Sequence, residues 1–136
     1  MGISIISDDK KVEFLRLSYT TFLKFRISVF AWLTNQAYGT AASNYLINLG
    51  EVNIAYIQKY KNYPGLIMFL LHSDHDGLWT WQECNIIASK VIGPVLQQAR
   101  EWKDNNGNNG DWYIVTKKFY DGLVYCSKNE LNAIFR

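Results

Sequence analysis

The sequence predicts a mainly α-helical (α+β) fold, a single compact domain over residues 1–136 with about four to five helices and a minor β element near the C-terminus. Three observations predict it. The chain of 136 residues has the length of one domain. Hydrophobic residues make up 49% and charged residues 19%, the composition of a folded globular protein. Apolar residues also recur at steps of three and four over much of the chain, which indicates amphipathic helices.

The first long helix is expected over residues 20–36. Before it, "ISIIS" (residues 3–7) is consistent with a short strand. Thr20 or Thr21 is suited to cap the helix N-terminus, and Gly39 to stop it. The apolar stripe that faces the core consists of Phe22, Phe25, Val29, Trp32 and Leu33.

The middle of the chain carries weaker helical signals. Residues 40–65 fit a shorter helix or a broken pair, interrupted at Gly50 and ended by Pro64 and Gly65. The next segment, "LIMFLL" (residues 66–71), is apolar on all sides and too short to classify by its period. It leads into an acidic loop, and we interpret it as a short buried helix.

A second long helix is expected from Thr80 to about Trp102. "TWQE" has the spacing of a capping box, in which Thr80 and Glu83 each satisfy a free amide of the first turn. Pro94 lies inside this segment and should kink or restart the helix. A polar loop (103–111), a helix or strand (112–120), a turn at "DG" and a strand over "LVYCS" (123–127) complete the prediction.

Bulk composition limits the partners and the location of the protein. A net charge of +2 with few Lys/Arg clusters makes a nucleic-acid partner unlikely, although "YIQKYKNY" (residues 56–63) interleaves bases with tyrosines. There is no apolar run long enough for a membrane span, and no leader pattern at the start. Two cysteines fit reduced, buried thiols of a cytoplasmic protein.

The segment "HSDHDGLWTWQE" (residues 72–83) is the most informative part of the chain. With Gly77 as its sixth residue, it aligns with a twelve-residue EF-hand calcium loop. The oxygen ligands, the glycine turn, the apolar eighth residue and the final glutamate then fall on Asp74, Asp76, Gly77, Trp79 and Glu83. The remaining ligand positions of the loop fall on His72, on the Leu78 carbonyl and on Thr80.

His72 is the exception, because an imidazole nitrogen is a poor ligand for a hard cation that prefers oxygen. Zinc accepts His, Asp and Cys, yet residues so close in sequence rarely converge around one ion, so calcium is favoured over zinc as the divalent cation. A metal-free turn held by its own carboxylates remains an equal alternative. Catalysis is disfavoured, because the sequence shows no separate nucleophile and base.

The same segment resembles a family of small bacterial and phage proteins. Their signature is HSDCDG followed by (S/T)PEEC, and their N-terminal SYxxFxxFR segment is similar to Ser18, Tyr19, Phe22, Phe25 and Arg26 here. "GLVYC", ending at Cys126, is similar to an apolar strand of that family. His75 and Trp81 stand where the family has cysteine and proline. The resemblance implies that His72 belongs to the pattern and that Arg26 is a charge partner for Asp74 or Asp76.

These observations favour a non-enzymatic binding or sequestering protein of bacterial or phage origin, such as an anti-defence or immunity factor, with a protein or small-molecule ligand. Aromatic residues make up 15% of the chain, and exposed rings would suit a recognition face or self-association into a homo-oligomer. A metal-dependent hydrolase using the His/Asp loop is one alternative. A nucleic-acid accessory protein is another.

Overall fold

The computed structural model describes residues 2–48, 51–72, 76–101 and 111–136. Its helices are α1 (Tyr19–Leu33), α2 (Tyr38–Tyr45), α3 (Ile54–Ile57), α4 (Leu66–Leu71), α5 (Trp81–Ile86), α6 (Gly93–Glu101) and α7 (Asp111–Lys128). A 3-10 turn (Gln58–Tyr60) follows α3, and a π-helical stretch (Ile87–Ile92) joins α5 to α6. The polar loop predicted over 103–111 falls almost entirely outside the described residues, as does the predicted interruption at Gly50.

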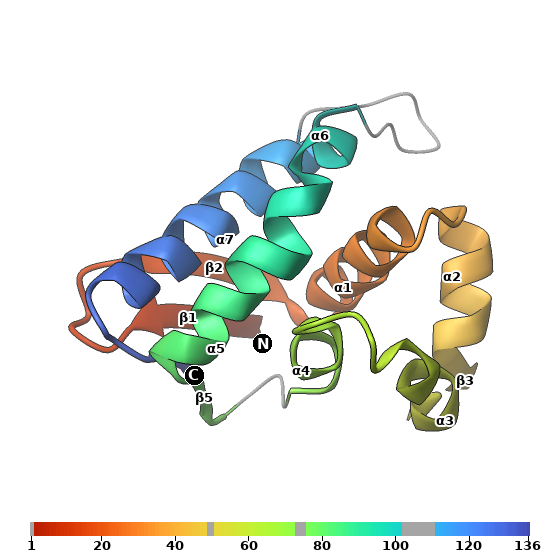
Figure 1. Ribbon diagram of the computed structural model, residues 1–136, viewed down its shortest axis with the longest axis horizontal. Coiled ribbons are helices and arrows are strands. Elements are labelled where there is room, and N and C mark those ends of the chain that lie inside the picture. Colours follow the sequence, from red (N-terminus) through yellow and green to blue (C-terminus); the bar gives the residue numbers. More distant parts are fainter. Residues whose placement is uncertain (1, 49–50, 73–75, 102–110) are drawn as a thin grey trace.

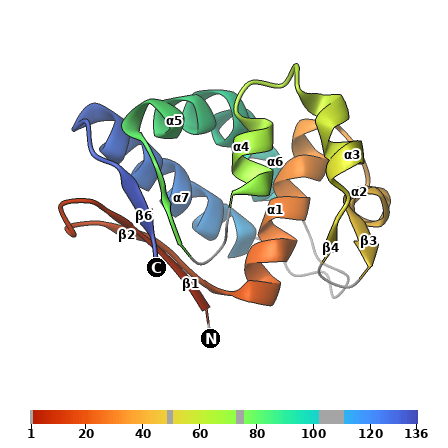
Figure 2. The same ribbon diagram turned by 90° about the horizontal axis from the view of Figure 1, so that it is seen from below.

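The strands form two antiparallel sheets. The larger has the order β2-β1-β6-β5, built from β1 (Gly2–Ser7), β2 (Glu13–Ser18), β5 (Leu78–Trp79) and β6 (Ala133–Phe135). The smaller pairs β3 (Leu46–Asn48) with β4 (Glu51–Val52). Figure 2 shows the larger sheet at one side of the molecule, with α5 and α7 over it and α1 to α3 on the opposite side. Two edges of the larger sheet, β2 and β5, have no neighbouring strand in this order.

The α+β class is confirmed, and the predicted strand at residues 3–7 is confirmed as β1. The restriction of β structure to the C-terminal part is wrong, because β1 and β2 of the larger sheet come from the N-terminus. The chain also breaks into more helical segments than the four to five expected, since residues 40–65 divide into short helices and a small hairpin.

Helix α1 begins earlier than predicted. Ser18 is its N-cap and its side chain accepts a hydrogen bond from the Thr21 amide at 3.1 Å, so neither Thr20 nor Thr21 caps it. The helix ends at Leu33, and the predicted stop residue, Gly39, lies inside α2. The predicted short helix at 66–71 is confirmed as α4. Pro94 does not break the second long helix, because the backbone stays helical at Gly93 and Pro94 lies in α6 directly after the π-helical stretch.

The prediction for residues 121–127 is wrong. The "DG" pair and "LVYCS" lie within α7, an uninterrupted helix from Asp111 to Lys128. The buried positions of this helix recur at steps of three and four across the glycine: Thr116, Phe119, Leu123 and Cys126. This spacing is the helical period, and it overrides the turn preference of an Asp–Gly pair.

The core joins the sheet to the helices through aromatic rings. Phe25 of α1, Phe69 of α4, Trp79 of β5 and Phe119 of α7 are fully buried, and their ring centroids lie 5.4–6.3 Å apart in each contacting pair. These separations are typical of favourable aromatic pairs. The four rings come from segments spread over nearly a hundred positions, so the cluster fixes how α4 and β5 sit on α1 and α7.

Candidate functional site

The acidic loop connects α4 to α5 through β5. His72 follows α4 as its C-terminal cap residue, and Gly77 has a φ of +88°, a backbone conformation that favours glycine. A glycine turn at the sixth loop position is what the EF-hand alignment requires. Asp76 is exposed beside it. Asp74 and His75, which the calcium and zinc interpretations use, lie outside the described residues.

The His72 side chain is held inside the loop. Its Nε2 lies 3.0 Å from the carbonyl oxygen of Leu78, at hydrogen-bonding distance. Its ring stacks on Phe135 of β6, with centroids 4.1 Å apart and planes 26° apart. The first and seventh positions of the loop, which would both ligate calcium in an EF-hand, are thus joined directly by a hydrogen bond.

The predicted capping box at the start of α5 is confirmed. The Glu83 amide donates to the Thr80 hydroxyl at 3.2 Å, and the Glu83 carboxylate accepts from the Thr80 amide at 2.9 Å. Glu83 is the twelfth position of the loop, where an EF-hand uses both carboxylate oxygens on the ion. Here one of those oxygens caps the helix.

These bonds support a loop that is closed by its own side chains. Calcium binding would require His72 and Glu83 to leave their present partners, and the His72 nitrogen remains a poor ligand for a hard cation. Among the residues that the structure describes, no three His, Cys, Asp or Glu side chains come together as a metal site. Because Asp74 lies outside that part of the chain, the divalent-cation interpretation stays a prediction.

One residue of the N-terminal motif, Arg26, contacts the acidic loop. Phe22 and Phe25 are buried in the core, Tyr19 is half-buried at the start of α1, and Arg26 is almost fully buried with its guanidinium 4.3 Å from the Phe22 ring. Arg26 donates to the backbone carbonyl of His72 at 2.7 Å. Of the two predicted charge partners of Arg26, Asp74 lies outside the described part, and the salt bridges between described residues do not include one to Asp76. The link between the motif and the loop is the Arg26 bond to the His72 carbonyl.

Two of the three tyrosines in residues 56–63 pack against helix α1. The rings of Tyr56 and Tyr60 both meet Phe30 of α1 edge-on, and their hydroxyls lie 3.0 Å apart. This hydroxyl contact and partial burial raise the pKa of Tyr60 to about 12. Of the three tyrosines in this segment, Tyr63 is the one with an exposed side chain. Rings engaged in this way cannot splay apart to stack on successive bases.

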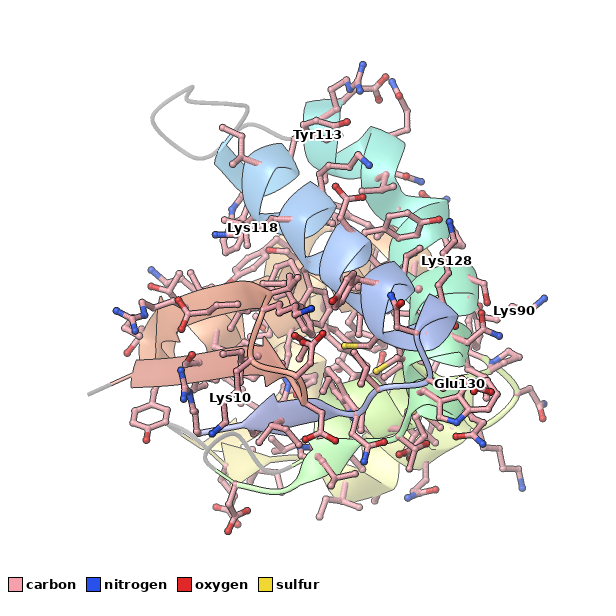
Figure 3. The ribbon with its side chains drawn as sticks, turned by 90° about the vertical axis from the view of Figure 1, so that its left-hand side faces the viewer. Lys10, Lys90, Tyr113, Lys118, Lys128 and Glu130 are labelled. Atoms are coloured by element: carbon pink, nitrogen blue, oxygen red, sulfur yellow. The ribbon has the colours of Figure 1, made fainter. Side chains whose placement is uncertain are left out.

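A second candidate site lies at the opposite edge of the larger sheet, between β2 and α7. An open groove of about 520 Å³ is lined mainly by apolar side-chain surface. Its residues are Val12, Phe14, Tyr113, Ile114, Lys117, Lys118, Asp121, Gly122 and Tyr125. Figure 3 shows this face, with Tyr113 and Lys118 on α7 and Lys10 in the turn of the β1–β2 hairpin. We call it the β2–α7 groove.

Sequence reasoning missed this groove, because three of its residues, Asp121, Gly122 and Tyr125, come from a segment predicted as turn and strand and not as part of one long helix. Gly122 lines the groove next to Phe14, and a Cβ at this position would overlap the ring of Phe14. The missing side chain lets α7 approach β2 closely. A signal was present in the helical spacing that continues through Asp121 and Gly122, but it was outweighed by the turn preference of that pair.

The groove adjoins a free sheet edge. Ser4 of β1 exchanges two backbone hydrogen bonds with Arg136, at 2.9 and 3.0 Å, and therefore turns its N–H and C=O toward β6. Arg16 faces Ser4 in the β1–β2 register. In an antiparallel pair, Arg16 must then turn its own N–H and C=O away from β1. Those two groups point to the outer edge of β2.

Comparison of the chain with family models, with curated proteins and with solved structures found no match. The family suggested by the loop and by the N-terminal motif therefore stays a resemblance. Within the described residues, no helix combines the length and the apolar character that crossing a membrane would require.

Proposed function

We propose that the protein is a non-enzymatic binding protein that takes an extended peptide segment of a protein partner along β2, with side chains of that segment in the β2–α7 groove. The observation that carries the proposal is the position of an open apolar groove directly beside a free strand edge. Strand addition of this kind uses main-chain hydrogen bonds for affinity and adjacent pockets for specificity.

The surface of the groove suits such a partner. The Ile114 side chain is 66% exposed, whereas core isoleucines such as Ile27 and Ile57 are buried. Tyr113 lies beside Ile114 and is half-buried. A large apolar side chain held at the surface loses contact with water when a partner covers it. The volume of about 520 Å³ is enough for two or three partner side chains.

The charges of the groove favour a segment with an acidic residue. Lys117 is paired with Asp121, with Nζ and Oδ1 2.6 Å apart. Lys118 is exposed, and the salt bridges of the described residues do not include it. Of the three charged groups that line the groove, one positive charge is therefore left over. Its main effect is on the rate of encounter and the choice of partner rather than on affinity.

The arrangement of the acidic loop gives less support to the hydrolase alternative. The metal-dependent hydrolase would hold its metal with Asp74, Asp76 and either His72 or His75. The His72 ring is bonded to a carbonyl and stacked on Phe135, and His75 lies outside the described residues. The groove would serve to sequester a protein partner, as an immunity or anti-defence factor does.

A displayed library of random peptides, selected on the immobilised protein, tests the proposal. We expect enriched sequences that combine apolar residues with an acidic one, and we expect the best of them, made as a free peptide, to shift the backbone amide resonance of Arg16 together with those of the groove residues. Enrichment that is equal on the Ile114→Glu variant, or peptide shifts confined to other elements, would refute the groove as the binding site.

The control variant is Ile54→Glu. Ile54 is 56% exposed on α3, so it presents a similar apolar surface outside the groove. Exposed substitutions of this kind usually change stability by no more than about 0.5 kcal/mol, so both variants should stay folded. A peptide that binds in the groove should lose at least about tenfold in affinity with Ile114→Glu and less than about twofold with Ile54→Glu.

A further inference from the structure

The two cysteines, 42 positions apart in the sequence, meet in the core. Cys84 lies in α5 and Cys126 in α7, and both are free and fully buried. These two helices pack side by side (Figure 1). The Sγ of Cys84 lies 3.9 Å from Trp79 O and that of Cys126 lies 3.8 Å from Asn132 O. Trp79 pairs with Ala133, the residue after Asn132, in the β5–β6 ladder, so both thiols lie against the same short stretch of paired backbone.

The two thiols are chemically unequal. Interaction with the Cys84 thiol lowers the pKa of Cys126, whereas interaction with Cys126 and burial raise the pKa of Cys84. Cys126 therefore takes the role of the attacking sulfur, because the thiolate is the nucleophile in thiol chemistry. It lies two residues before the end of α7, under the turn that leads to β6. The last turn of a helix opens more readily than its middle.

We propose that Cys84 and Cys126 are a redox modification site, in which a peroxide converts the neighbouring thiols into an intramolecular disulfide that a dithiol reverses. The Cys126 thiolate attacks one oxygen of hydrogen peroxide, the O–O bond breaks, and hydroxide leaves to give a sulfenic acid. Cys84, losing its proton, then attacks the sulfur of the sulfenic acid and expels the second oxygen as water. Two thiols and one peroxide thus become one disulfide and two waters.

The cross-link would connect the two candidate sites. Cys84 directly follows Glu83, the residue that caps α5 and closes the acidic loop. Cys126 directly follows Tyr125, which lines the β2–α7 groove. Joining the two sulfurs ties the first turns of α5 to the end of α7. A disulfide that closes a loop of this length stabilises the folded state mainly by restricting the unfolded chain.

The test is oxidation of the full-length folded protein with hydrogen peroxide, followed by alkylation in denaturant. We expect both thiols to resist alkylation, the intact mass to fall by two hydrogens, and one peptide pair to carry the Cys84–Cys126 link. The midpoint of thermal unfolding should rise by roughly 5–10 °C and return on treatment with dithiothreitol. Thiols that remain alkylatable after oxidation, or a disulfide between two molecules, would overturn the proposal.

Single variants separate this reaction from simple oxidation of an accessible thiol. In Cys84→Ala, Cys126 keeps its place but has no resolving partner, so peroxide should add oxygen to it instead of removing hydrogen. In Cys126→Ala, Cys84 should react more slowly than Cys126 does in the first variant. Equal rates for the two remaining thiols would contradict the assigned order of attack. If either variant does not fold, mass analysis of the unaltered chain still decides whether the disulfide forms.

Discussion

The acidic loop and the β2–α7 groove differ in how their polar and apolar groups are used. In the loop, His72, Thr80 and Glu83 find their partners within a few residues, and Arg26 holds the loop backbone from α1. In the groove, Ile114 and Lys118 extend into solvent. The loop satisfies its own hydrogen-bonding groups, whereas the groove leaves an apolar surface and a strand edge uncovered.

This difference shows why a conspicuous cluster of polar residues is a weak guide to a binding site. Carboxylates, hydroxyls and a glycine also make a stable inter-helix connection, because each can satisfy a nearby backbone group. A groove such as this one depends instead on side chains that are small or absent at particular positions. At the β2–α7 groove, the absence of one side chain at Gly122 brings two distant segments together.

The largest effect is expected from Gly122→Ala. The new methyl group would occupy the space of the Phe14 ring, which is itself buried against Phe119 at 5.9 Å. Overpacking of this kind costs about 1–3 kcal/mol or more, and it outweighs the gain of up to about 1 kcal/mol that alanine offers over glycine within a helix. Urea unfolding monitored by tryptophan fluorescence would measure the loss, and peptide binding at the groove should be lost with it.

Gly39→Ala is the matched control. Gly39 is also helical, in α2, but a Cβ there would meet nothing within 4 Å. Alanine should therefore stabilise the protein by up to about 1 kcal/mol. If both substitutions changed the free energy of unfolding in the same direction, the close approach of α7 to β2 would not be the reason for Gly122.

The next prediction concerns His72→Asp, which tests whether the acidic loop is closed or only weakly metal-binding. Aspartate removes the bond to the Leu78 carbonyl and the stacking on Phe135, so the metal-free variant should lose about 1–2 kcal/mol of stability. It also supplies the carboxylate that the first position of a calcium loop normally has. Millimolar calcium should then raise the melting temperature of the variant more than that of the natural chain.

His72→Asn separates the two contributions, because asparagine offers an oxygen without the charge. Calcium should shift its melting temperature less than that of His72→Asp, since the charge of the ligands helps to set calcium affinity. A calcium shift that is as large in the natural chain as in His72→Asp would mean that the imidazole does not obstruct the ion, and the closed-loop interpretation would fail.

Parts of the acidic loop and of the fold could be predicted from sequence, for local reasons, whereas the β2–α7 groove could not. The capping box at Thr80 and Glu83 depends on residues three positions apart, and its bonds formed as expected. The helical stripe of Phe22 and Phe25 is likewise a short-range signal. The position of the His72 ring depends on Phe135, 63 positions away. The need for glycine at position 122 depends on Phe14, which is still more distant in the sequence. No local pattern carries such contacts.

The smallest effect is expected at Asp9, which ties the β1–β2 turn to α7 beside the groove. Its carboxylate accepts hydrogen bonds from Ser7 and, at 2.6 Å, from the Tyr125 hydroxyl, and these bonds lower the pKa of Asp9. A carboxylate whose pKa is lowered by folding stabilises the protein above its unfolded pKa, and this contribution is lost as the pH falls through the folded value. Asp9→Asn should therefore weaken the protein slightly near neutral pH and make no difference in strong acid.

Asp8→Asn is the control for this last comparison, because Asp8 is the exposed neighbour in the same turn. Urea midpoints measured from neutral pH down to strong acid should run parallel for Asp8→Asn and the natural chain, whereas the Asp9→Asn curve should converge with the natural one as the pH falls. Tyr125→Phe removes one of the two side-chain donors to Asp9 and should shift the midpoint of that convergence upward in pH. An Asp9→Asn difference that persists unchanged in acid would show that the turn is held by packing and not by the charge of Asp9.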